Sequence, residues 1–353
     1  MFRHNLLIVF RNFKRFKGTF LINIIGLSTG LACTLLIYLW VSGELNFDKF
    51  HAKDDRLYQI MENQQLEEGI KTTDGTTGAL ADALKQEMPE IEYVATVTPA
   101  AWFPKVTLTH NEKSIRGTGQ FAGADFFNIF SYELTQGNKD QVLADKKSIV
   151  ISEELAKRMF GTTENVVGKP IKWQWQAFAE EYLVSGVFKS NPNSSAQFDY
   201  LLPFAWLKER FTFLMEWGNY GPNTFVVLKP GSSAEQFNAK LAGFMKKKLP
   251  ETNRTLFAAK YSDNYLYGKY ENGVQAGGRI EYVKLFSIIA IFILVIACVN
   301  FMNLSTAKAS QRMKEVGLKK TLGATRKSLI FQYFAESLLI AFISLILAVI
   351  MVL

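Results

Sequence analysis

The sequence predicts an α-helical transmembrane bundle joined to a mixed α/β extracytoplasmic domain of two lobes. Three apolar stretches are long enough to cross a bilayer as helices, because about 20 helical residues span its hydrocarbon core. Between the first two stretches lies a long region with 28 basic and 30 acidic residues, the balance of an ordinary folded domain. The surplus of positive charge is confined to two short segments beside the apolar stretches, and this distribution predicts the topology.

The N-terminal segment, residues 1–18, contains five basic residues and no acid, and its apolar residues recur every three or four positions. This pattern predicts an amphipathic helix in the inner membrane interface. Residues 19–41 follow as the first transmembrane helix. A cleaved signal peptide is disfavoured because the apolar run is too long and no small-x-small site follows it. A lipid-modified Cys33 is disfavoured because Gly30 stands where an aliphatic residue is needed.

The remaining elements alternate across the membrane. Basic segments beside spans stay in the cytoplasm, so residues 1–18 and 307–327 are predicted to lie inside. Residues 42–284 then lie outside, and residues 285–306 and 328–353 form the second and third transmembrane helices. The third apolar stretch reaches the final residue without a polar anchor. We therefore expect the chain to be a fragment whose missing part holds at least a fourth span.

A few residues within the spans suggest specific packing. Gly26 and Gly30 form a GxxxG pattern, which either brings two helices into close association or serves ordinary packing against a neighbouring span of the same chain. Asn23 and Asn300 are polar at membrane depth and should face protein. Glu336 is either a proton or substrate group or a carboxylate that reaches a headgroup or a basic partner.

The cytoplasmic segment after the second span combines many cations with a short apolar pattern. Its apolar residues and its helix-breaking glycines are Met313, Val316, Gly317, Leu318, Leu322 and Gly323. A solvated basic loop would not need such a pattern. The segment therefore predicts a short helix that inserts into a groove on another protein.

This segment is similar to the signature of FtsX-like and MacB-type ABC transporter permeases, and it stands where that family places it, between the second and the third span. The signature runs Arg-x-x-Glu-[Ile/Val]-Gly-Leu-[Arg/Lys]-Lys-x-Leu-Gly-Ala-[Thr/Ser]-Arg, and Thr321 occupies a position at which alanine is commoner. The N-terminal segment, first span and large external domain also resemble the family, so the resemblance covers essentially the whole chain. The residues carried over as the ATPase-coupling segment are Arg312, Glu315, Val316, Gly317, Leu318, Lys319, Lys320, Leu322, Gly323, Ala324 and Arg326.

The resemblance implies a non-catalytic permease subunit that transmits force. A separate ABC ATPase would bind ATP and Mg²⁺, so no cofactor is expected on this chain. It also implies a bacterial inner-membrane location with a cytoplasmic N-terminus, a periplasmic core domain, and contact with membrane lipid. A second permease unit, either another copy or the second half of a longer chain, is expected, and a periplasmic adaptor and outer-membrane duct are further partners. Family members export peptides, antibiotics or toxins, release lipoproteins, or gate cell-wall hydrolases.

The external domain reads as mixed α/β. Residues 56–63 and 91–97 are predicted strands on either side of a helix near 77–86. A polar stretch at 136–147 is predicted to separate two lobes. A group of aromatic residues is expected to pack in a core or interface rather than to bind a ligand: Trp173, Trp175, Phe178, Trp206, Phe211, Phe213 and Trp217.

Other function classes have little support in the sequence. Gly161 and Gly168 are too far apart for a phosphate loop, and Pro170 replaces the required hydroxyl residue. The histidines are scattered, so no metal or catalytic cluster is predicted. A nucleic-acid binder would carry its basic surplus on a folded domain. A sensor kinase would follow its second span with a long signalling module, whereas an anchored enzyme would need a catalytic set.

Overall fold

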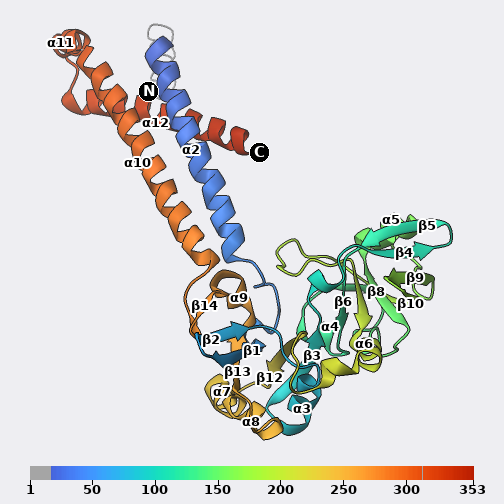
Figure 1. Ribbon diagram of the computed structural model, residues 1–353. Coiled ribbons are helices and arrows are strands. Elements are labelled where there is room, and N and C mark those ends of the chain that lie inside the picture. Colours follow the sequence, from blue (N-terminus) through green and yellow to red (C-terminus); the bar gives the residue numbers. More distant parts are fainter. Residues whose placement is uncertain (1–16, 312) are drawn as a thin grey trace. The chain divides into compact units, whose positions relative to one another are not determined.

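The computed structural model describes residues 17–311 and 313–353, so most of the predicted N-terminal helix, together with Arg312, lies outside the described residues. The chain forms two compact units. One is helical and comes from Met1–Leu45 and Ile280–Leu353, and the other is the domain Asn46–Arg279. Figure 1 shows the long helices of the first unit and the sheet of the second.

The helical unit contains three helices that are long and apolar enough to cross a membrane, α2 (Lys17–Leu45), α10 (Arg279–Gln311) and α12 (Arg326–Val352). Helix α10 starts directly after Gly277 and Gly278, and both residues have positive φ angles, which glycine adopts readily. Both α2 and α10 extend beyond the two ends of the apolar runs.

Helices α2 and α10 approach each other closely. A Cβ atom on Gly30 would lie 2.5 Å from the Cβ of Ala297, and one on Gly26 would lie 3.2 Å from Nδ2 of Asn300. Farther along the pair, the rings of Trp40 and Phe286 meet edge to face at 5.0 Å. The GxxxG pattern thus lies against a neighbouring span of the same chain, which is one of the two roles that the sequence suggests for it.

The domain is built on one sheet of 13 strands that divides into two lobes. We define lobe A as residues 46–97 and 223–279, and lobe B as residues 98–222. Lobe A contains strands β1 (Leu57–Leu66), β2 (Gly69–Thr73), β3 (Ile91–Val97), β12 (Asn223–Leu228) and β13 (Arg254–Lys260), with helices α3 (Leu80–Glu87), α7 (Ala234–Ala242), α8 (Phe244–Lys248) and α9 (Tyr261–Tyr267) and the small hairpin β14–β15 (Tyr270–Glu271, Val274–Gln275).

Lobe B is an insertion between β3 and β12. It contains strands β4 (Val106–His110), β5 (Lys113–Gly117), β6 (Gly119–Ala122), β7 (Leu134–Gln136), β8 (Ser148–Ser152), β9 (Pro170–Trp175), β10 (Phe178–Phe188) and β11 (Tyr200–Pro203), with helices α4 (Phe126–Ile129), α5 (Glu153–Phe160) and α6 (Phe204–Arg210). The main path of the sheet runs β13-β1-β12-β3 in lobe A and β6-β11-β8-β10-β9-β4-β5 in lobe B (Figure 1).

Within the sheet, the two lobes join at a seam where β3 pairs with β6 through the single residue pair Val97 and Ala122. The predicted boundary at 136–147 is therefore wrong, because β7 and β8 on its two sides both pair with β10. Its polar residues form local turns instead of a linker. Asn138 accepts from the backbone of Asp140, and Ser148 donates to the carbonyl of Asp145. The predicted fold class itself, transmembrane helices with a mixed α/β domain, is confirmed.

Three buried apolar clusters hold the domain together. One lies within lobe A, one within lobe B, and the third includes residues of both lobes. Trp173 and Trp206 are fully buried in the lobe B cluster, and the indole N–H of Trp173 donates to the hydroxyl of Tyr200 at 2.9 Å. Most of the predicted aromatic group therefore belongs to the core, whereas Phe213 is 52% exposed.

Candidate functional site

The candidate site is the segment that the sequence predicts to couple to an ATPase, and it forms a short helix, α11 (Met313–Thr321), between α10 and α12. None of the residues of α11 is buried. Gly317 lies in its middle, and a Cβ atom built there meets no atom within 4 Å. The helix therefore has free space on the side of this glycine.

A tight glycine turn ends α11. The N–H of Gly323 donates to the carbonyl of Lys320 at 3.1 Å, and the N–H of Ala324 donates to that of Lys319 at 3.0 Å. These two bonds form a Schellman motif, which requires the left-handed backbone that Gly323 adopts at φ +92°. Thr325 then caps α12, since its hydroxyl accepts from the N–H of Ser328. The sequence Gly-Ala-Thr thus fixes how one helix ends and the next begins.

A polar contact links the two helices beyond the turn. The ammonium of Lys319 lies 2.8 Å from a carboxylate oxygen of Glu315, one helical turn earlier, and 3.3 Å from the amide oxygen of Gln332 on α12. The sequence alone identified Glu315 and Lys319 but not their link to Gln332. The spacing of four residues suggests the first contact, whereas the second depends on how α12 folds back beside α11.

The apolar residues of the segment face outward. Met313, Leu318 and Leu322 are 70%, 63% and 80% exposed, and Val316 is half-buried. Exposed cations lie among them, at Lys314, Lys320, Arg326 and Lys327. Packing within the described chain therefore does not account for the apolar pattern. A mixed apolar and cationic surface on a short helix suits a groove on a partner protein.

Two family models match the chain. The model described as the MacB-like periplasmic core domain matches residues 20–244, and the model described as the FtsX-like permease C-terminal region matches residues 287–353. The chain belongs to the MacB and FtsX-like permease family. It is an ABC transporter permease of this family, a membrane protein with a periplasmic domain.

Relatives of the permease include bacterial transport proteins. It is 25% identical over 232 residues to the ABC transporter permease YvrN of Bacillus subtilis, a match covering 64% of this chain and 54% of that protein. It is 23% identical over 263 residues to the macrolide export ATP-binding/permease protein MacB of Neisseria gonorrhoeae, covering 71% of this chain and 37% of that protein. The permease thus spans about half or less of the length of these relatives.

A solved structure shares the fold of the domain. A permease-protein domain from Porphyromonas gingivalis is 26% identical to the permease and matches it with a TM-score of 0.50. The match covers 60% of this chain and 93% of that one.

The spans of the permease contain a further polar site, whose residues Asn23 and Glu336 the sequence identified separately but did not predict to lie together. Asn23 and Glu336 are 2% and 4% exposed, and both line a small cavity of about 30 Å³ together with Ser305 and Tyr333. Glu336 is thus enclosed by protein in this chain rather than extended toward headgroups. Asn300 lies against Gly26 but is largely exposed. Polar residues in separate spans signal such sites, but which of them meet depends on helix packing.

Proposed function

We propose that this permease couples ATP hydrolysis by a separate ATPase to conformational change of its periplasmic domain. The observation that carries the proposal is the exposed apolar surface of α11 and the turn after it, which includes Leu318 and Leu322. In this proposal α11 docks into a groove on the ATPase, the ATP and Mg²⁺ belong to that partner, and the basic residues of the segment complement acidic groups around the groove.

The topology that this function requires has the N-terminus and residues 307–327 in the cytoplasm. The strong positive charge of both segments supports it. The three apolar helices then cross the membrane in alternating directions, and the domain Asn46–Arg279 lies in the periplasm of a bacterial inner-membrane protein.

Helix α10 is the proposed transmission element. It is one continuous helix of 33 residues, roughly 50 Å long, that begins at the last residue of the domain and ends just before α11. A displacement of α11 by the ATPase would therefore move the end of a rigid rod whose other end is covalently joined to the domain. The link from Lys319 to Gln332 would carry the same displacement into α12.

The proposed process is export of peptides, antibiotics or lipoprotein-type substrates from the inner membrane or periplasm. The macrolide export proteins among the relatives support an export role. A second permease unit completes the assembly in this proposal, and a periplasmic adaptor and outer-membrane duct extend it.

The proposal is tested with Gly317→Leu. A Cβ atom at this position meets no atom within 4 Å, and leucine favours a helix more than glycine by up to about 1 kcal/mol, so we expect α11 to stay folded. We expect the variant to lose stimulation of the co-purifying ATPase because leucine clashes with the groove. Gly218→Leu, at an equally open and exposed glycine of the domain, serves as the control. Normal stimulation in Gly317→Leu would refute the docking role of α11.

Orientation is tested separately by labelling with a membrane-impermeant thiol reagent. Lys320→Cys should be labelled only after the inner membrane is permeabilised, whereas Lys246→Cys in the domain should be labelled from outside in spheroplasts. Labelling of Lys320→Cys from outside would invert the topology and overturn the proposal.

A further inference from the structure

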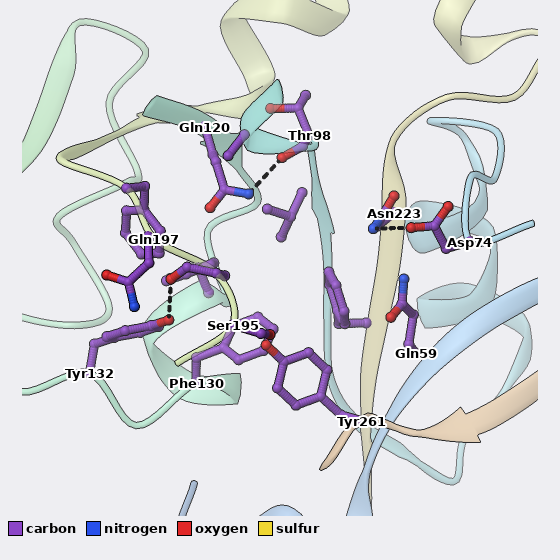
Figure 2. Close-up of a pocket in the computed structure, with 16 residues that line it drawn as sticks. Gln59, Asp74, Thr98, Gln120, Phe130, Tyr132, Ser195, Gln197, Asn223 and Tyr261 are labelled. Atoms are coloured by element: carbon purple, nitrogen blue, oxygen red, sulfur yellow. Dashed lines mark hydrogen bonds between the residues drawn. The ribbon is translucent and has the colours of Figure 1, made fainter. Parts of the chain in front are cut away.

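The periplasmic domain contains a cavity beside the seam of its two lobes. Its volume is about 390 Å³, at the lower end of the range of roughly 300–1,000 Å³ typical of small-molecule sites. Strands and loops of both lobes form its wall, so segments more than 200 residues apart meet there. Figure 2 shows their side chains around the central space.

Neutral amide side chains line the cavity from both lobes. Gln59 on β1 and Asn223 on β12 belong to lobe A, and Gln120 on β6 and Gln197 before β11 belong to lobe B. In Figure 2 the lobe A pair and the lobe B pair lie on opposite sides of the space. Each amide carries both donors and an acceptor, so the cavity can satisfy a ligand that has both.

Internal hydrogen bonds hold several of these amides in place. Gln120 donates to the carbonyl of Thr98 at 2.8 Å, and Asn264 donates to the amide oxygen of Gln59 at 2.8 Å. Asn223 donates to Asp74 at 3.3 Å, but its own amide oxygen is buried and has no hydrogen-bond partner among the described residues. A buried acceptor without a partner is costly, and a ligand N–H would relieve that cost after a small rotation of the side chain.

Aromatic rings form the apolar part of the wall. Phe130 packs edge to face against Phe225 at 5.1 Å and against Tyr261 at 5.2 Å, so the rings support one another. The hydroxyl of Tyr132 bonds to Ser194 at 2.7 Å. Burial raises the pKa of Tyr132 and of Tyr261, so both hydroxyls stay neutral. This wall suits aliphatic or aromatic groups of a ligand.

Charge is nearly absent from the lining. Asp74, at an exposed position, is the one charged residue among the lining residues of the described chain. A cationic group of a ligand could pair with its carboxylate, whereas an anionic group would meet only a like charge and neutral dipoles. The lining therefore selects against anions.

We propose that this seam cavity binds a short peptide segment that is uncharged or carries one positive charge beside Asp74. A peptide backbone offers N–H and C=O groups at short intervals, which the opposed amides of Gln59, Gln120, Gln197 and Asn223 match. Its side chains supply the apolar groups that the rings accommodate. The inference concerns what the domain binds and does not depend on α11. A negative result in the binding test therefore leaves the ATPase proposal standing, and the reverse also holds.

The test measures binding of three dipeptide probes to the full chain in lipid nanodiscs by isothermal titration calorimetry. Leu-Phe-amide carries a free ammonium, acetyl-Leu-Phe-amide is neutral, and acetyl-Leu-Phe is an anion. We expect the cation to bind two- to five-fold more tightly than the neutral probe, the gain typical of an exposed ion pair, and the anion to bind most weakly. Asp74→Asn should abolish the preference for the cation over the neutral probe.

Two further variants locate the site. Ala100→Trp, at a half-buried lining residue, should fill the cavity and abolish binding, whereas Ala177→Trp on an exposed turn of lobe B should not. Because a new tryptophan can disturb folding, Gln197→Ala at an exposed lining position is the milder test and should weaken binding several-fold, with Gln174→Ala on β9 as its control. The proposal is overturned if none of the probes binds, if the anion binds best, or if binding survives in both Ala100→Trp and Gln197→Ala.

Discussion

The periplasmic domain and the coupling segment use apolar residues in opposite ways. In the domain, large side chains such as Trp173 and Trp206 are fully enclosed, and three clusters account for most of the apolar residues. In α11 and the turn after it, Leu318 and Leu322 face outward. The domain's pattern is explained by its own fold, whereas packing within the described chain does not explain the pattern of the segment.

Charges differ between the two regions in the same way. Many cations on the domain surface have acidic partners, among them Lys147 and Arg210, which share Glu180. In α11 the described ion pair is that of Lys319 with Glu315. The remaining cations of the segment leave it with a strong positive surplus, which an acidic partner surface would neutralise. Burial and charge balance therefore separate the part that stabilises the chain from the part that we propose recognises a partner.

The largest expected effect on stability comes from the domain core. Trp173→Ala should lower the free energy of unfolding of the domain by about 3–5 kcal/mol, because it leaves a cavity and removes the partner of the Tyr200 hydroxyl. Urea unfolding followed by circular dichroism measures the loss. Trp173→Phe, which keeps much of the volume, should lose less, and equal losses in the two variants would contradict the packing argument.

The next effect is on pH dependence, through Glu62 on β1. Burial raises the pKa of its carboxyl to about 7. The positive charge of Arg254, 3.4 Å away, lowers the pKa, but this effect is smaller than that of burial. The folded state therefore holds a proton that the unfolded state releases above its ordinary pKa. The contribution of Glu62 to stability should fall by about 3 kcal/mol as pH rises from about 4.5 to 7, at 1.4 kcal/mol per pKa unit. Glu62→Gln should remove this contribution.

His51 should show the opposite dependence. Burial lowers the pKa of its imidazole to about 4, and its Nδ1 accepts the N–H of Ser131 at 3.0 Å in the neutral form. As pH falls from about 6.5 to 4, the unfolded state takes up a proton that the folded state refuses, which costs stability of a similar size. Unfolding curves of Glu62→Gln between pH 7 and pH 4 should therefore show a loss of stability as pH falls. In the parent protein, the opposite effect of Glu62 partly offsets this loss. A Glu62→Gln variant as pH-insensitive as the parent would contradict both assignments.

A smaller loss is expected at the contact of α2 with α10. Gly30→Ala forces the new Cβ to within 2.5 Å of Ala297, and overpacking of this kind costs about 1–3 kcal/mol. The yield of folded protein from membranes should fall, while the melting of the domain stays unchanged. Ala297→Gly should restore the yield in the double variant, and Gly18→Ala, at a position with open space, should have no effect. Failure of the rescue would show that the two residues do not meet.

The sequence was sufficient for features that depend on local composition. Apolar runs predicted the three long helices, and the spacing around Gly317 and Gly323 identified the family. The lobe boundary was missed because the polar residues around Asn138 signal a turn as strongly as a linker, and only strand pairing distinguishes the two. The contact of Lys319 with Gln332 and the cavity beside the seam both join residues distant in sequence, so no local pattern marks them.

The smallest effect on stability is expected for Leu322→Ser, and this variant gives the most direct test of the contrast between the domain and the segment. Leu322 is 80% exposed, so Leu322→Ser should change the free energy of unfolding by less than about 0.5 kcal/mol. The same change removes an apolar anchor from the proposed ATPase contact and should reduce ATPase stimulation by ten-fold or more, since anchor residues of an interface cost 1.4 kcal/mol or more when lost. Val274→Ser, at a 68% exposed apolar residue of the domain, should leave both quantities unchanged. A Leu322→Ser variant with normal ATPase stimulation would mean that the exposed leucine has no partner, and the contrast between the two regions would then lose its functional meaning.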